Sequence, residues 1–203
     1  MRLGINDCSA NEVIHKFSEK NLSRIFKIFG EEKMHKVIAK KIIKDREQSI
    51  LLTEDLVRII DAIKRKKNQK IHSSTKVFQS LRIFVNKEIS ELIYSLINGF
   101  NILPIGGVMI VVTFHSLEDK IVKFFFKNYS EEKNLSRYLP KKKIDEKIFK
   151  IINKKPILPS EYEIKLNPPS RSAKLRYALK IKNHKNFEEF KNKFKYLTDI
   201  EDL

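Results

Sequence analysis

An apolar, β-branched run at residues 108–114 (Val-Met-Ile-Val-Val-Thr-Phe) constrains the fold of this chain more than any other feature. Such a run is typical of a strand that is buried on both faces of a parallel sheet. It is followed by His115, and Ser116 with Asp119 three residues later has the spacing of a capping box that begins a helix. The pattern predicts a buried strand leading into a capped helix, with polar residues at the carboxyl end of the sheet, where open α/β sheets bind ligands. An ordinary capped strand–helix junction without a ligand is the alternative.

Three long blocks of sequence carry a resemblance to a known family. They are residues 72–88 (HSSTKVFQSLRIFVNKE), 113–123 (TFHSLEDKIVK) and 167–176 (NPPSRSAKLR). In order and approximate distance they resemble blocks of the bacterial small-subunit (16S) rRNA cytosine-N4 methyltransferase family (MraW-like), whose members use S-adenosylmethionine. The resemblance extends from Met1 to about Lys182.

The resemblance implies an α/β fold: an incomplete class I (Rossmann-like) methyltransferase sheet with an inserted small all-helical domain. Residues 1–70 would be the helical substrate-recognition insertion. Residues 71–182 would be the carboxyl-terminal part of the methyltransferase α/β domain, and residues 183–203 a basic tail outside the resemblance.

Hydrophobic periodicity adds local expectations. Apolar residues at helix spacing predict several helices between residues 9 and 67, and one long helix from about Lys76 to Asn101. Residues 173–180 alternate, with Leu175 and its apolar neighbours on one side and the basic residues on the other, which predicts a half-buried strand. We expect it to pair with a short strand at 149–152, and residues 183–203 to form a loosely docked helix.

The cofactor-binding part of the family is not recognisable in this sequence. Its five glycines include no G-x-G, so no glycine-rich loop for a cofactor is predicted. In the family, Met1-Arg2-Leu3 would correspond to an internal segment that follows the cofactor-binding half. The resemblance therefore implies S-adenosylmethionine as cofactor but no cofactor-binding residue here, and a separate cofactor-binding half or a homodimer as possible partners.

The charge of the chain points to a polyanionic partner. Lys and Arg total 42 against 25 Asp and Glu, a net charge of +17, which favours nucleic acid, although compositional drift in an AT-rich genome is the alternative. The single cysteine, Cys8, the scattered histidines and the absence of an 18-residue apolar stretch predict a cytoplasmic protein with neither a metal site nor a membrane span. The family implies small-subunit rRNA or the assembled small ribosomal subunit as the partner.

Three groups of residues are candidates for binding RNA. The first is a basic run that could contact phosphates or be a solvated linker: Lys64, Arg65, Lys66 and Lys67. The second is a pair on the predicted long helix, within a family block, whose side chains suit bases or phosphates: Arg82 and Asn86. The third is a basic cluster near the end of the resemblance: Arg171, Lys174 and Arg176.

The catalytic candidates are His115, Glu118 and Asp119. His115 could move a proton, although a lone histidine at a strand end is more often structural, and carboxylates are favoured at a helix amino terminus in any case. The family implies methylation of the exocyclic amine of a decoding-region cytidine. A non-catalytic basic rRNA-binding module and a truncated gene product are the alternative hypotheses.

Overall fold

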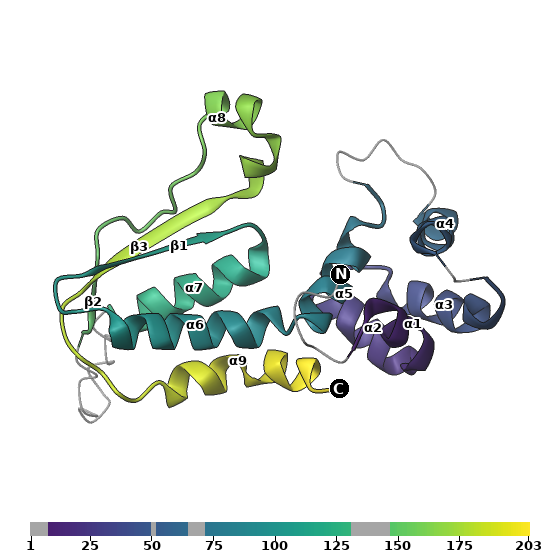
Figure 1. Ribbon diagram of the computed structural model, residues 1–203, viewed down its shortest axis with the longest axis horizontal. Helices are drawn as coiled ribbons and strands as arrows, with labels where there is room; N and C mark the ends of the chain where they lie inside the picture. The colour runs from purple at the N-terminus through teal and green to yellow at the C-terminus, as the bar shows by residue number, and fades with distance from the viewer. Residues whose placement is uncertain (1–7, 50–51, 65–71, 131–146) are drawn as a thin grey trace, which may run out of the picture. The chain divides into compact units, whose positions relative to one another are not determined.

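The computed structural model describes residues 8–49, 52–64, 72–130 and 147–203. They divide into two compact units: a helical unit, residues 1–90 with 195–203, and a sheet unit, residues 91–194. Figure 1 shows the elements of each unit. The division differs from the functional domains predicted above, because residues 72–88, the first family block, pack with the helical unit.

The helical unit begins with five helices, of which α2 packs against both α3 and α5. Their bounds are α1 (Ala10–Lys16), α2 (Glu19–Ile28), α3 (His35–Ser49), α4 (Thr53–Lys64) and α5 (Thr75–Val85). Ser9 caps α1 and forms a reciprocal capping box with Glu12, as this spacing predicts. Leu22, Ile25 and Phe26 of α2 are fully buried, so the apolar stripes of the sequence form the core of this unit.

The predicted single helix over residues 76–101 is wrong, because the chain breaks after α5. The next helix, α6, spans Glu88–Ile102. Asn86 caps the end of α5, and Lys87 adopts a left-handed backbone conformation with φ of 50°. A left-handed residue cannot continue a right-handed helix, so the apolar stripe continues on a second helix.

The sheet unit contains three strands in the order β1-β3-β2. Strands β1 (Val108–Thr113) and β2 (Phe149–Ile151) each pair antiparallel with β3 (Lys174–Lys180), which confirms the predicted pairing of the 149–152 and 173–180 segments. Neither the predicted parallel pairing nor the burial on both faces is provided by the described residues of this chain. Within the described residues β1 is an edge strand with one antiparallel neighbour, and its exposure alternates along its length.

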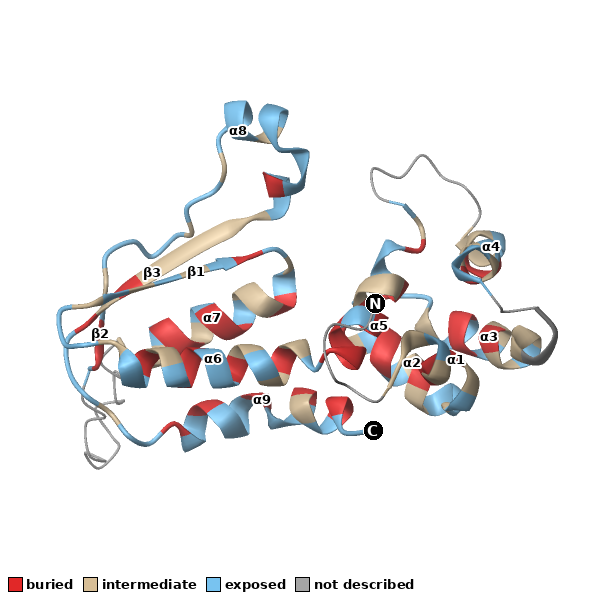
Figure 2. Cartoon of the chain, viewed as in Figure 1, coloured by how far each residue is buried: buried red, intermediate tan, exposed pale blue. Residues whose placement is uncertain are grey.

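The register separates the two faces of the sheet. Helix α7 (Ser116–Asn128) packs against all three strands and covers one face of the sheet. On this face, the side chains of Arg176 and Lys174 of β3 donate hydrogen bonds to Asp119 on α7. On the opposite face, which we call the open face, Val108, Ile110 and Val112 are 45%, 61% and 48% exposed. Figure 2 shows β1 and β3 mostly in the exposed and intermediate colours while α7 carries a buried stripe.

Between β2 and β3 lie two short elements, α8 (Glu161–Leu166) and the 3-10 helix η1 (Pro168–Ser172). The chain ends with α9 (Glu188–Glu201), so the predicted helix in the tail is confirmed. It is not loosely docked, because Phe187, Phe190 and Phe194 are at most 3% exposed. The ring of Phe190 lies 4.8 Å from that of Phe125 on α7, so α9 is part of the core.

Both ends of α6 are held by buried charged residues. The Glu201 carboxylate accepts hydrogen bonds from the amides of Ile89 and Ser90 at the start of the helix. The Lys180 ammonium donates to the carbonyl oxygens of Phe100 and Leu103 at its end. Each charge has the sign that the helix dipole favours at that terminus. Among the described residues, no helix is long and apolar enough to cross a membrane.

Candidate functional site

The candidate site is the junction between β1 and α7, which the structure caps with a different residue from the predicted one. The residue that caps α7 is His115, so the predicted box of Ser116 and Asp119 is wrong by one residue. His115 is extended, with φ of −135° and ψ of 164°, while Ser116 is already helical. The Nδ1 atom of His115 accepts a hydrogen bond from the Glu118 amide at 3.3 Å, and the Glu118 carboxylate accepts one from the His115 amide at 3.3 Å. This is a capping box with histidine in the place of serine or threonine.

The imidazole of His115 is enclosed by this box. Its Nε2 atom is buried and lies 3.2 Å from a carboxylate oxygen of Glu118, without the geometry of a hydrogen bond. Burial alone would raise the pKa of Glu118, but interactions with His115 and the amide of Phe114 outweigh it and leave that pKa below its usual value. His115 and Glu118 therefore hold the start of α7, and their participation in proton transfer stays a prediction.

Asp119 joins α7 to the central strand. Its carboxylate accepts hydrogen bonds from Nε and Nη2 of Arg176 at 2.7 and 3.2 Å, and from Nζ of Lys174 at 3.3 Å. Burial would raise the pKa of Asp119, but the hydrogen bond and charge of Arg176, with those of Lys174, outweigh it and lower the pKa. A forked arginine–carboxylate pair is geometrically specific, so it sets the position of the first turn of α7 on the sheet.

The structure thus brings together five of the predicted residues: His115, Glu118, Asp119, Lys174 and Arg176. Lys174 and Arg176 are not a free basic cluster, because Asp119 pairs with both. Arg171 lies in η1 and is exposed, with no ion pair to a carboxylate in the described part of the chain. The prediction that these three residues bind RNA is not tested by their positions.

Lys64 differs from the solvated cation that the sequence suggests. Its ammonium pairs with the buried carboxylate of Glu32 and donates to the carbonyl of Ser73, and its side chain is only 11% exposed. In this arrangement Lys64 joins α4 to the segment before α5 and does not present its charge to a phosphate. The rest of the predicted basic run, Arg65, Lys66 and Lys67, lies outside the described residues.

Arg82 and Asn86 lie together at the end of α5. The amide of Asn86 donates to the carbonyl of Arg82 at 3.0 Å, and the Arg82 guanidinium makes a forked pair with Glu88 at 3.0 and 3.1 Å. Arg82 stays 48% exposed. Both residues therefore stabilise the break between α5 and α6, and their predicted contact with RNA stays a prediction.

Two buried residues that hold the ends of α6 were not predicted from the sequence. Lys180 is 2% exposed and Glu201 is 3% exposed, and each satisfies the backbone at one end of α6. Neither carries a local signal, because each contacts residues about 80 to 110 positions away. Long-range capping of this kind is invisible to spacing rules, which compare neighbours only.

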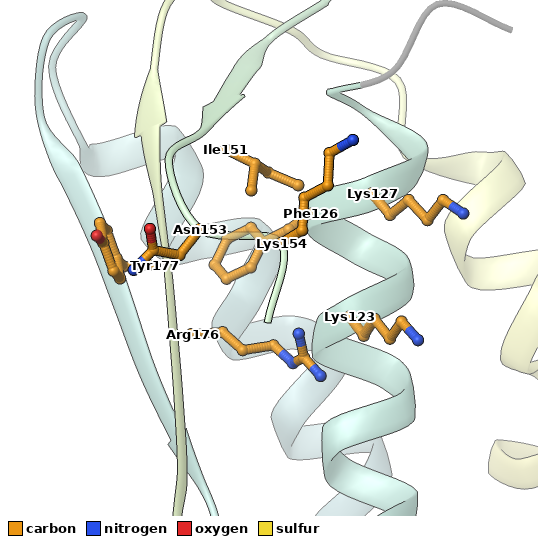
Figure 3. A pocket seen from close by; sticks show the side chains of 8 residues that line it. All are labelled: Lys123, Phe126, Lys127, Ile151, Asn153, Lys154, Arg176 and Tyr177. Carbon is orange, nitrogen blue, oxygen red and sulfur yellow. The ribbon is translucent and has the colours of Figure 1, made fainter. Parts of the chain in front are cut away.

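A basic cleft lies between α7, β3 and the segment that follows β2. Its volume is about 240 Å³ and its lining residues are Lys123, Phe126, Lys127, Ile151, Asn153, Lys154, Arg176 and Tyr177. Figure 3 shows Arg176 reaching from β3 toward α7, with Phe126 and Ile151 between the helix and the strands.

The basic cleft does not fit S-adenosylmethionine. The basic cleft has four cationic side chains, which would repel the sulfonium cation of that cofactor. Its volume is also below the roughly 300–1,000 Å³ usual for sites that enclose a whole small molecule. With no G-x-G in the sequence, no step of a methyl transfer can be assigned to a cofactor bound by these residues.

Comparison with known proteins agrees with the blocks of sequence described above. Residues 1–181 match the MraW methylase family. A ribosomal RNA small subunit methyltransferase H from Agrobacterium fabrum is 44% identical over 182 residues, which are 89% of this chain and 53% of that protein. Proteins of the same description from Rhodopseudomonas palustris and Brachyspira hyodysenteriae are 42% and 41% identical over 87% and 89% of this chain. The chain spans about half the length of the curated relatives it matches.

Proposed function

This chain belongs to the MraW methylase family, and we propose that it forms the rRNA-facing, sheet-completing part of a small-subunit rRNA cytosine-N4 methyltransferase. The complete enzyme would methylate the exocyclic amine of a decoding-region cytidine. S-adenosylmethionine would be bound by the part of the family's length that this chain does not span.

The observation that carries the proposal is the open face of the sheet, together with the edge of β1. The edge of β1 that faces away from β3 has no strand beside it among the described residues. Three branched apolar side chains of β1 are each about half exposed on the open face. A free edge beside an apolar face is a surface that soluble proteins normally cover. We propose that a further parallel strand pairs with β1 and that a second layer covers the open face, which would make this sheet one end of a class I methyltransferase sheet.

The residues of this chain would serve that reaction by position. Methyl transfer requires the cytosine amine to be aligned with the methyl donor within a fraction of an ångström. The box of His115 and Glu118 and the pair of Asp119 and Arg176 fix the carboxyl end of β1 relative to α7. We propose that these four residues act by positioning, while a role of His115, Glu118 and Asp119 in proton transfer stays a prediction.

A non-catalytic rRNA-binding module is the second candidate, supported by the net charge of +17. A chimaera separates the two. The amino-terminal part of the Agrobacterium fabrum relative, joined in register to this chain, should methylate small ribosomal subunits in the presence of S-adenosylmethionine. Mass spectrometry of nuclease digests would detect N4-methylcytidine in the small-subunit rRNA.

Each part alone is the matched control and should give no product. A chimaera that melts cooperatively and binds S-adenosylmethionine, yet leaves the rRNA unmethylated, would favour the non-catalytic module. Methylation by this chain alone would contradict the assignment of the cofactor site to another part of the enzyme.

A further inference from the structure

The basic cleft contains two lysines that no ion pair among the described residues neutralises. Of its four cations, Arg176 is paired with Asp119, whereas Lys123 and Lys154 are exposed and have no carboxylate partner in the described part of the chain. Among the residues that the structure describes, no carboxylate lines the cleft. An anion held beside Lys123, Lys154 and Arg176 would neutralise this excess of positive charge.

The pair with Asp119 prepares Arg176 for such an anion. Two of the five N–H donors of a guanidinium are used by Asp119, so three are left for a ligand. The side chain is only 11% exposed and is held at both ends, by β3 and by the carboxylate. A guanidinium fixed in this way offers donors in the plane that suits phosphate oxygens, at little cost in side-chain entropy.

The dimensions favour part of a polymer over a whole small molecule. A volume of about 240 Å³ accommodates a phosphate and part of a nucleotide, with the apolar surfaces of Phe126 and Ile151 beside it. Positive charge continues outside the cleft, since Lys120, Lys123 and Lys127 recur at intervals of three and four and are exposed. They extend over about 10 Å of helix at 1.5 Å per residue, which is longer than one phosphate group.

We propose that the basic cleft and the lysine row of α7 bind the phosphate backbone of an rRNA strand, with Arg176 holding one phosphate inside the cleft and Lys123 and Lys154 contacting its neighbours. The proposal rests on the function proposed above and adds a binding site to it. Lysines that act as point charges and one oriented arginine supply affinity and register without reading bases.

The test is the binding of this chain to a fluorescent small-subunit rRNA fragment over a range of salt concentrations. The double variant Lys123→Gln/Lys154→Gln should lower the slope of log affinity against log salt by about 1.4–1.8, since each lost phosphate contact contributes about 0.7–0.9. At 0.15 M salt this corresponds to binding that is about 10- to 30-fold weaker. The matched control, Lys16→Gln/Lys191→Gln, removes two exposed lysines that pair with Glu12 and Glu188. It has the same net charge and should leave the slope nearly unchanged.

The outcomes separate the site from the proposed function. If the unchanged chain fails to bind the rRNA fragment, the proposed function itself is contradicted. If the chain binds but the two double variants behave alike, with equal thermal midpoints, the charge of the whole chain is responsible and the cleft is not the site. Displacement of the RNA by millimolar inorganic phosphate only for the unchanged chain would support the cleft. An RNA affinity that phosphate leaves untouched, while phosphate still occupies the cleft by NMR, would assign the cleft to a small anion instead.

Discussion

Replacing Lys180 with methionine tests how a buried charge stabilises the sheet unit when no described carboxylate pairs with it. The Lys180 ammonium donates to the carbonyl oxygens of Phe100 and Leu103 at 2.7 and 2.6 Å and lies 4.1 Å from the centre of the Phe100 ring. The backbone of Lys180 also exchanges hydrogen bonds with Gly106 and Gly107 ahead of β1. The residue therefore holds the end of α6 and the turn into β1 on β3.

The expected loss is the difference between two opposing effects. Lys180→Met leaves the buried carbonyl of Phe100 unsatisfied, which costs about 1–3 kcal/mol, whereas water can reach the carbonyl of Leu103 at a cost of about 0.5–1.5 kcal/mol. The helix terminus also loses a favourable cation, worth up to about 2 kcal/mol in buried geometry. Against this, the variant avoids the cost of burying an ammonium, which is several kcal/mol per ion. Because the lysine makes two short bonds and a cation–π contact, we expect a net loss of about 2–4 kcal/mol.

Chemical denaturation monitored by circular dichroism would measure this loss, and the thermal midpoint should fall by about 4–16 °C for a chain of this length. Lys150→Met is the matched control, because Lys150 is an exposed lysine on the neighbouring strand β2. It should change the free energy of unfolding by less than about 0.5 kcal/mol. A Lys180→Met variant as stable as the unchanged chain would show that the desolvation of the ammonium outweighs its hydrogen bonds.

Three further results are expected. Asp119→Asn should lower the free energy of unfolding by about 2–4 kcal/mol at pH 7, because it leaves the nearly buried Arg176 without its partner. This difference should shrink as the pH falls from 3.8 through the lowered pKa of Asp119, since protonation of the carboxylate removes the ion pair. Burial raises the pKa of Glu201, so its contribution to the free energy of unfolding should be largest below pH 4.5 and should decline as the pH rises through the raised pKa. Denaturation curves of Glu201→Gln and the unchanged chain at several pH values would show this trend, and a difference independent of pH would contradict it. Ile110→Lys on the open face should leave the stability of the chain nearly unchanged, because Ile110 is exposed. It should weaken association with the amino-terminal part of a relative, or with a second copy, in light-scattering measurements. Association equal to that of the unchanged chain would mean that the open face is not a contact surface.

Local signals in the sequence predicted the elements well where the stabilising contact is also local. The capping box of Ser9 and Glu12 and the apolar face of α2 form as expected. The start of α7 shows the limit of such reasoning. Ser116 and His115 both have a carboxylate three residues ahead in the sequence. His115 is the last extended residue and Ser116 is already helical, so the box forms at His115, one residue earlier than the preferred capping residue types indicate.

Breaks and caps that depend on distant residues could not be predicted. The apolar stripe from Leu81 to Leu96 continues across the junction of α5 and α6, so periodicity alone favours one helix. The break is stabilised by Asn86, by the pair of Arg82 with Glu88, and by the carboxylate of Glu201 at the start of α6. Of these, only Glu201 satisfies the free amides at the start of α6, and it lies about 110 residues further along the chain.

Strand β3 shows most directly how a correct pattern can be realised in an unexpected way. Its period of two is confirmed, and an isolated half-buried strand of this composition is expected to bury its apolar side and expose its basic side. The structure has the reverse arrangement: Arg176 and Lys180 face the helices, whereas Leu175, Tyr177 and Leu179 are only partly covered on the open face. The basic side can be buried because Asp119 pairs with Arg176 and the end of α6 accepts the ammonium of Lys180. The apolar side has no such partner among the described residues, and burying it would release about 25 cal/mol for each Å² removed from water. Satisfied charges on one side of the central strand and uncovered apolar residues on the other support the proposal that a second layer covers the open face.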